Sequence, residues 1–448
     1  MKTTRAIAAI ALAVLVAACG AAPGSDNAAN KKNAQPKATA TSKPDISKEG
    51  PVTLTVWDQE VRGGQNAQMK QLIAAFQKKY PNVTINRVAK SFTDLQKTLK
   101  LAVSGPKAPD VVEANQGRPI MGALVTAGLL RPITDYAKIY GWRDRYSPTL
   151  LSLNSFSSDG KEFGSGELYG LSQMGEIVGL FYNKDKVPNP PKTLDELEQQ
   201  LQKAKAAGDV GIQFGNVDKW PGIHEYESVL GQSADKQAVR DFVFAKPDAS
   251  FDNPQFTQAA ATLSDWVKKG YFNKGFSGTN DVAALQQFAK GKGYFMIAGT
   301  WDTADLVKAM GDKVGFVPMP GKDPDNPVSL GGESLPFAIT SASKHPDVAA
   351  AYIDFITSPQ AAQTLVDTDN LPAMKGAPTP SSGLPADVAA AWQKLNQVDG
   401  IIPYLDYTTP TFYDDITAAI QELLGGKQSP KQFTAGVQKA FDKWNNSR

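Results

Sequence analysis

Residues 52–60 read VTLTVWDQE, an alternation of apolar and polar side chains that ends in three polar residues. A period of two predicts a β-strand, and the polar residues after it predict a loop at the strand's end. A helix is expected next, because Met69, Leu72 and Phe76 recur at helical spacing. Pro81 then predicts the end of that helix. The chain therefore begins with a strand–loop–helix unit.

The same rhythm continues along the chain. A second strand is predicted at residues 83–85, a helix over residues 92–103, and a short buried strand at residues 111–112. Strands that alternate with helices indicate an α/β protein with a parallel sheet. About 400 residues follow residue 50. That is more than one hydrophobic core usually holds, so we expect two lobes.

The N-terminus predicts export and lipid attachment. Lys2 and Arg5 precede an apolar run from Ala6 to Ala18, which is shorter than the roughly 20 residues that span a bilayer. The run ends in VAACG at residues 16–20, which resembles the bacterial lipobox, whose cysteine is diacylated and becomes the first mature residue. We therefore expect a signal peptide at residues 1–18 and a lipid on Cys19. The alternative is a plain secretory signal with an incidental cysteine.

Residues 19–50 are expected to form a lipidated, disordered tether. Ile46 is the only large aliphatic residue from residue 20 to residue 50, and there is no aromatic residue, so too little apolar surface is available to offset the entropy of ordering. Cleavage before Cys19 leaves 45 basic and 45 acidic residues. This balance indicates no nucleic-acid partner. Cys19 is the sole cysteine, so we expect no intramolecular disulfide and no Cys-rich metal site. We also expect no other metal site and no cofactor.

Short motifs recur along most of the chain. They are FQKKYPNV at 76–83, PDVV at 109–112, GLLRPI at 128–133, LYGLS at 168–172, LFYNKD at 180–185, FAKGKGYFM at 288–296, GTW at 299–301 and GGE at 331–333. In this order and spacing they resemble the family 1 extracellular solute-binding proteins, the sugar-type periplasmic binding proteins similar to maltodextrin-binding protein. Ser172 departs from the pattern, because the family usually has proline there.

The resemblance implies a type II-like periplasmic-binding-protein fold, with two α/β lobes, three hinge crossings and a ligand cleft between the lobes. The crossings are expected near residues 172–176, 315–320 and 357–360. Lobe one would comprise residues 51–172 and 320–357, and lobe two residues 173–319 and 358–448.

The resemblance also implies a function. The protein would be a monomeric, lipid-anchored, solute-binding subunit of an ABC importer on the outer face of the cytoplasmic membrane. It would capture a mono- or oligosaccharide by hinge closure and deliver it to the membrane permease. It would bind without catalysis.

Candidate ligand residues are sought in loops at strand ends, because ligands of open α/β sheets sit beyond the carboxyl ends of strands. A sugar offers apolar C–H faces to aromatic rings and hydroxyls to carboxylates and amides. The candidates are Trp57, Asp58, Gln59, Glu60, Asn115, Gln116, Gln173, Glu176, Trp220, His224, Glu225, Trp301, Asp302, Gly332, Glu333 and Tyr404. The competing interpretation is structural: Trp57 would be core and Asp58 would cap a turn. Residues 219–226 show no helical period, so Trp220 is predicted to be a stacking platform.

Two other interpretations stay open. The solute could be a polyamine, a phosphodiester or a peptide, or the protein could be a glycoside hydrolase that uses two carboxylates. Against a serine hydrolase, residues 332–336 read GESLP and lack the final glycine of the nucleophile motif. A metal-binding receptor is disfavoured, because His224 and His345 are the only histidines.

Overall fold

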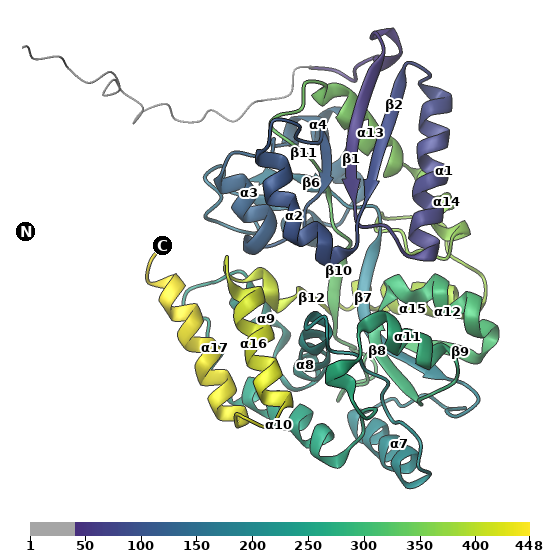
Figure 1. Ribbon diagram of the computed structural model, residues 1–448, viewed down its shortest axis with the longest axis vertical. Coiled ribbons are helices and arrows are strands. Elements are labelled where there is room, and N and C mark those ends of the chain that lie inside the picture. Colours follow the sequence, from purple (N-terminus) through teal and green to yellow (C-terminus); the bar gives the residue numbers. More distant parts are fainter. Residues whose placement is uncertain (1–40) are drawn as a thin grey trace, which may run out of the picture. The chain divides into compact units, whose positions relative to one another are not determined.

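The computed structural model of the protein describes residues 41–448 (Figure 1). The predicted signal peptide, Cys19 and the tether up to residue 40 lie outside the described residues. Within the described range, no helix combines the length and the apolar character that a membrane crossing needs.

The last residues of the predicted tether are packed, so the expectation of disorder up to residue 50 is wrong for them. Ile46 begins the 3-10 turn Ile46–Lys48 and is 1% exposed within the core. The side-chain amide of Asn82 donates to the carbonyl of Ile46 at 2.9 Å, and Lys43 pairs with Asp354 at 3.2 Å. Burial of one such aliphatic side chain stabilises by about 1.5–3 kcal/mol, and it acts together with these polar contacts to hold the segment.

The first sheet contains the strand–loop–helix unit predicted at residue 52. Its strand order is β2-β1-β3-β11-β6. The strands are β1 (Val52–Asp58), β2 (Val83–Ala89), β3 (Val111–Glu113), β6 (Gly170–Leu171) and β11 (Phe337–Ile339). β1 pairs in parallel with β2 and β3, whereas β11 is antiparallel to its neighbours. The predicted strands at residues 52, 83 and 111 are confirmed, and the parallel sheet is confirmed for these three.

The second sheet is mostly antiparallel. Its strand order is β12-β10-β7-β8, with β9 also paired to β7. The strands are β7 (Gly175–Asn183), β8 (Phe295–Gly299), β9 (Val314–Val317), β10 (Ser329–Glu333) and β12 (Ile401–Ile402), and a separate hairpin joins β4 (Ser155–Phe156) to β5 (Glu167–Leu168). Every residue of β7 is buried. Such a strand lacks alternation, because both of its faces are covered.

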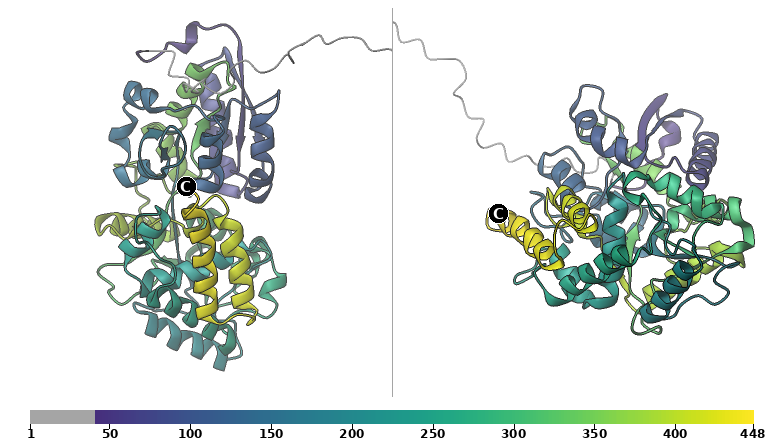
Figure 2. Two further views of the ribbon diagram at one scale, coloured as in Figure 1. Left: turned by 90° about the vertical axis from the view of Figure 1, so that its left-hand side faces the viewer. Right: turned by 60° about the horizontal axis from the view of Figure 1, so that its bottom comes forward.

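Helices cover both sheets (Figures 1 and 2). Those before residue 220 are α1 (Gly63–Lys79), α2 (Phe92–Ser104), α3 (Ala123–Thr126), α4 (Thr134–Tyr140), α5 (Trp142–Arg145), α6 (Pro148–Leu153) and α7 (Leu194–Ala206). The others are α8 (Trp220–Ser233), α9 (Lys236–Val243), α10 (Pro254–Lys269), α11 (Asp281–Ala289), α12 (Thr303–Met310), α13 (Pro346–Ile356), α14 (Pro359–Asp367), α15 (Gly383–Gln397), α16 (Phe412–Leu424) and α17 (Pro430–Asn445). The yellow helices α16 and α17 lie side by side in Figure 2 and pack on each other.

Three segments connect the two sheets, and they hydrogen-bond to one another. Residues 172–174 lead from β6 to β7, as predicted. The Ser334 amide donates to the Met174 carbonyl at 2.9 Å, and the Gly175 amide donates to the Leu371 carbonyl at 2.8 Å. The Ala373 amide donates to the Gln173 carbonyl at 3.0 Å. These bonds bring the three connections together as a hinge.

Two of the predicted crossings are displaced. β10 pairs with β7, so the chain returns to the first sheet at residues 334–336 and not near residues 315–320. α14 packs on α1, so the last crossing comes at residues 371–373 and not near residues 357–360. We propose a first lobe of residues 41–172 and 334–370 and a second lobe of residues 173–333 and 371–448.

β10 approaches β7 closely through its glycines. Gly331 has a φ of +149°, and a Cβ there would lie 2.1 Å from the carbonyl oxygen of Glu176. Only glycine fits such a backbone. The GGE motif at residues 331–333 is therefore explained by strand pairing beside the hinge.

Candidate functional site

A pocket between the two lobes is built from side chains of both. Its lining residues are Gln59, Arg62, Gln65, Phe92, Asn115, Glu176, Trp220, Ile223, His224, Trp301, Leu335, Tyr404, Asp406, Tyr407 and Tyr413. The first five belong to the first lobe and come from the loop after β1, from α1 and α2 and from the end of β3. Leu335 lies on a hinge crossing, and the rest come from the second lobe. The pocket thus lies where the strands of the first sheet end, next to the hinge.

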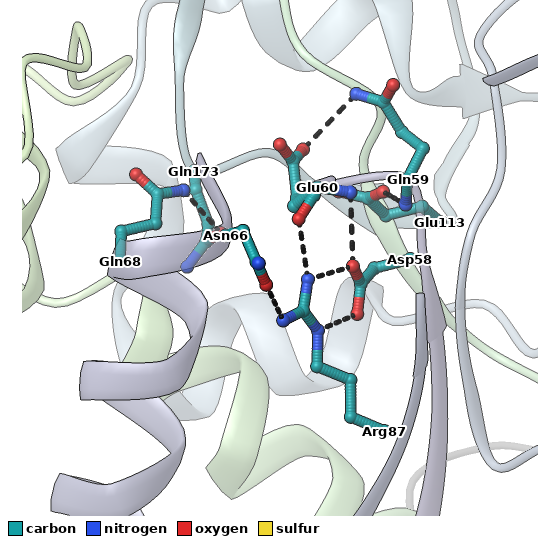
Figure 3. Close-up of polar contacts among 8 residues, drawn as sticks. All are labelled: Asp58, Gln59, Glu60, Asn66, Gln68, Arg87, Glu113 and Gln173. Atoms are coloured by element: carbon teal, nitrogen blue, oxygen red, sulfur yellow. Dashed lines mark hydrogen bonds and ion pairs between the residues drawn. The ribbon is translucent and has the colours of Figure 1, made fainter. Parts of the chain in front are cut away.

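Ion pairing fixes the loop after β1 (Figure 3). Arg87 on β2 donates to both oxygens of Asp58 at 2.6 Å, and its Nη2 also donates to the Glu60 carbonyl at 2.7 Å. The backbone amide of Gln59 donates to Glu113 Oε2 at 2.6 Å, which ties the loop to the end of β3. A guanidinium that bonds a carboxylate through two nitrogens imposes orientation as well as attraction. These bonds fix the loop, so Gln59 is held in place at the pocket.

The loop after β1 and the residues that hold it contain more acidic groups than cations. Asp58, Glu60 and Glu113 are all 0% exposed, and the nearby cation Arg87 pairs with the carboxylate of Asp58. Burial raises the pKa of Glu60 to about 7 and the pKa of Glu113 well above its usual value. Burial also raises the pKa of Asp58, although Arg87 opposes the rise. A buried carboxylate without a counter-charge is costly, so this cluster retains a proton near neutral pH.

Aromatic rings form an arc on the side of the second lobe. The ring centroids of Trp220 and Trp301 are 6.0 Å apart, those of Trp301 and His224 are 5.7 Å apart, and those of His224 and Tyr404 are 5.1 Å apart. Tyr407 extends the arc at 5.6 Å from Tyr404. Burial lowers the pKa of His224 to about 4, so its ring is neutral at pH 7. These five rings all line the pocket, and their planes are tilted by 49° to 82° to one another.

Trp220 and His224 lie on α8, a helix that the sequence did not indicate because residues 219–226 show no helical period. Nearly every residue of α8 is buried, including those on both sides of the helix. A helix that is covered all round carries no apolar stripe, so its sequence shows no 3.6-residue period. Pro221 at the first turn is compatible with a helix start.

Arg62 joins the two lobes across the pocket. It precedes α1 in the first lobe, and its Nη2 lies 2.8 Å from Asp281 Oδ2. It also pairs with Asp302, which follows β8 in the second lobe and is 0% exposed. Desolvation makes such a pair weak as a net stabiliser, but removal of either partner leaves a buried charge unpaired.

Comparison with known proteins identifies the family. A family model described as bacterial extracellular solute-binding protein matches residues 71–398, well over half of the chain. The chain belongs to this family.

Individual relatives of this solute-binding protein are distant but span most of its length. The galactooligosaccharide-binding protein of Bacillus subtilis is 25% identical over 85% of this chain and 86% of the relative. The maltooligosaccharide ABC transporter solute-binding lipoprotein of Streptococcus pneumoniae is 24% identical over 83% and 81%. A solved structure named chitin oligosaccharide binding protein aligns with a TM-score of 0.76 at 23% identity, over 88% of this chain and 99% of that one. This likeness shows the two-lobed fold.

Part of the predicted ligand set lines the pocket of the solute-binding protein. These residues are Gln59, Asn115, Glu176, Trp220, His224, Trp301 and Tyr404. They come from distant parts of the sequence and meet because the hinge brings both lobes together. Their contact with a ligand stays a prediction.

The other predicted residues lie outside the lining. Trp57 is half-buried on β1, where the ammonium of Lys90 lies 4.7 Å from its ring centroid. Gln116 donates to the carbonyl of Ser334 at 2.9 Å, and Gln173 donates to the carbonyl of Ile356 at 2.9 Å, so both brace the hinge. The remaining members are buried and also lie outside the lining: Asp58, Glu60, Glu225, Asp302, Gly332 and Glu333.

Sequence reasoning missed several lining residues. They are Arg62, Gln65, Phe92, Ile223, Leu335, Asp406, Tyr407 and Tyr413. Arg62 lies two residues beyond the predicted loop segment, and Asp406 and Tyr407 lie two and three residues after Tyr404, so a wider window would have included them. Phe92 and Tyr413 gave no local signal, because both begin ordinary amphipathic helices. Among residues 41–448, no group of His, Cys, Asp and Glu side chains is arranged to hold a metal ion.

The acid cluster predicts how stability depends on pH. The native pKa of Glu60 is about 7 and its ordinary value is 4.5, so the native state binds more protons between these values. Its contribution to stability is therefore complete below pH about 4.5 and is lost as the pH rises to about 7. Measured by urea unfolding, the free energy of unfolding of the wild type should fall between pH 5 and pH 8 by an amount to which Glu60 contributes on the order of 2 kcal/mol. Glu60→Gln should remove that contribution. The free energy of unfolding of the exposed control Glu162→Gln should fall as much as that of the wild type. An equal fall for Glu60→Gln would show that Glu60 does not cause the pH dependence.

Proposed function

We propose that this protein is the extracytoplasmic solute-binding subunit of an ABC importer and that it captures a carbohydrate between its lobes. The observation that carries the proposal is the interlobe pocket, which is lined by the aromatic arc together with amide and carboxyl groups. Family membership supports the binding role, and relatives named for galactooligosaccharide and maltooligosaccharide support the class of solute.

The chemistry of the pocket suits a sugar. Trp220, Trp301 and Tyr404 offer flat apolar faces that can cover the C–H side of a pyranose ring. Gln59 and Asn115 offer amide groups that donate and accept hydrogen bonds to hydroxyls from the opposite lobe. A ligand held in this way contacts both lobes only when they are closed, so it shifts an existing open–closed equilibrium.

We propose reversible binding without catalysis, and delivery of the unchanged sugar to the permease. Membership in a family of binding proteins supports this interpretation over the glycoside hydrolase. Recovery of the unaltered sugar after prolonged incubation would agree with it, and a hydrolysed sugar would refute it. Binding of only polyamines, phosphodiesters or peptides would refute the carbohydrate class.

The positions of the tryptophans predict which of them contributes to the affinity for sugar. Trp301→Ala should weaken binding of the best sugar in a calorimetric screen by about 2 kcal/mol, or roughly 30-fold, because truncation of a central aromatic contact has that effect. Trp57→Ala is the matched control: it removes a half-buried tryptophan outside the pocket and should leave affinity within about threefold. A larger loss in Trp57→Ala than in Trp301→Ala would place the sugar elsewhere.

The interlobe ion pairs predict a change in closure. Arg62→Gln leaves Asp302 buried without its cation, so the ligand-free protein should open to let water reach that carboxyl. Small-angle X-ray scattering should record a larger radius of gyration than for the wild type. The exposed control Arg143→Gln should match the wild type, and an unchanged radius for Arg62→Gln would show that these pairs do not hold the lobes.

We propose that Cys19 anchors the protein to the outer face of the cytoplasmic membrane. The sequence VAACG at residues 16–20 supports this, as does a relative named as a lipoprotein. Two or more acyl chains are needed for a stable anchor, which a diacylated cysteine supplies. Cys19→Ser should move the protein from the membrane fraction to the soluble fraction of the producing cells. Retention of this variant in the membrane fraction would refute the anchor.

A further inference from the structure

Two polar groups of the pocket have no protein partner. Glu176 is 7% exposed, lines the pocket and forms no side-chain hydrogen bond or ion pair with any residue of the described range. The Tyr404 hydroxyl is also buried without a hydrogen-bond partner among those residues. Buried polar groups are nearly always bonded in folded proteins. The Tyr404 hydroxyl is enclosed, whereas the Glu176 carboxyl lines the pocket, so Glu176 indicates that a ligand supplies its missing partner.

The lining holds more ionisable acids than free cations. Glu176 and Asp406 contribute carboxyl groups, and Arg62 contributes the one guanidinium among the lining residues. That guanidinium is already paired with Asp281 and Asp302. His224 adds no charge, because burial lowers its pKa to about 4. The lining thus offers acids without a free cation of its own.

The aromatic arc favours the same kind of partner. Ring faces attract cations through their quadrupole when the charge lies within about 6 Å of the ring centroid. Tyr404 and Tyr407 have centroids 5.6 Å apart, and both line the pocket with Glu176. A group that is both cationic and rich in hydrogen-bond donors would satisfy the rings and the acid together.

We propose that the solute is a carbohydrate that carries a protonated amino group, with Glu176 as the counter-ion of that group. This inference rests on the proposed function and narrows its class of substrate. An ammonium has three donors and no acceptor, so it matches a carboxylate better than a neutral hydroxyl does. Charge-assisted bonds are also about twice as strong as neutral ones, which gives selectivity.

Proton release accompanies such binding. Glu176 faces Glu60 and Arg62 from the first lobe, Tyr404 and Tyr407 from the segment at residues 404–407, and Glu333 from β10. Burial raises the pKa of Glu176 to about 8, so the carboxyl is mostly protonated at pH 7. An ammonium that pairs with it displaces this proton. The heat of binding should therefore depend on the ionisation enthalpy of the buffer for an amino sugar and much less for a neutral sugar.

The test uses sugars that differ at one carbon. Calorimetry on the purified protein compares glucose, galactose and mannose with their 2-amino and 2-acetamido forms, and cellooligosaccharides with chitin and fully deacetylated chitosan oligosaccharides. We expect at least one amino form to bind ten or more times tighter than its hydroxyl and acetamido counterparts. Glu176→Gln should reduce this preference to less than threefold, and the exposed control Glu162→Gln should retain it. Glu176→Ala serves as a second variant if Glu176→Gln does not fold, because it removes the same carboxyl, and it too should reduce the preference.

The outcomes separate this inference from the proposed function. If neutral or acetylated sugars bind as tightly as the amino forms, or if the preference survives in Glu176→Gln, the inference is wrong and the carbohydrate role stands. If no amino sugar of the panel binds, the inference is also wrong. If spermidine binds and no sugar does, the carbohydrate role fails as well.

Discussion

Arg87 fixes the end of β1, and the site depends on that contact. Its guanidinium bonds both oxygens of Asp58 and the carbonyl of Glu60, so the loop after the strand leaves in one direction. From that loop Gln59 reaches the pocket and Arg62 reaches the opposite lobe. One buried ion pair therefore positions both a lining side chain and the connection between the lobes. Loss of Arg87 would leave the buried carboxylate of Asp58 without its cation and the carbonyl of Glu60 without this donor.

The sequence predicted the start of the first sheet because its elements carry a clear period. β1 alternates, α1 repeats at helical spacing, and Pro81 ends the helix. The period fails where elements are covered on all sides. β7 and α8 are buried throughout, so neither shows an amphipathic pattern, and the helix at residue 220 was missed for that reason. The displaced crossing at residues 334–336 has a different cause: Gly331 and Gly332 give no strand signal, although their backbone pairs with β7.

Strand geometry explains why neighbouring candidate residues have different surroundings. Successive side chains of a strand point to opposite faces, so Trp57 and Asp58 cannot both face the same neighbour. Asp58 points inward to Arg87, and Trp57 remains half-exposed beside Lys90. Sequence placed both at the strand's end, but it could not tell which residue was the last of the strand. Trp301 differs, because it follows β8 in a 3-10 turn that carries its ring beside His224.

Buried charged groups set the equilibrium between the open and closed arrangements of the two lobes, both of which a solute-binding protein needs. Arg62 favours closure, because its carboxylate partners lie in the other lobe. Glu176 opposes closure, because it is buried without a partner and its burial costs free energy. A ligand shifts an equilibrium only by its difference in affinity for the two states, so neither state may be favoured too strongly beforehand. A solute that bonds Glu176 removes the opposing cost at the moment of binding. The unpaired acid thereby makes closure depend on the solute, and the paired arginine keeps the closed arrangement within reach.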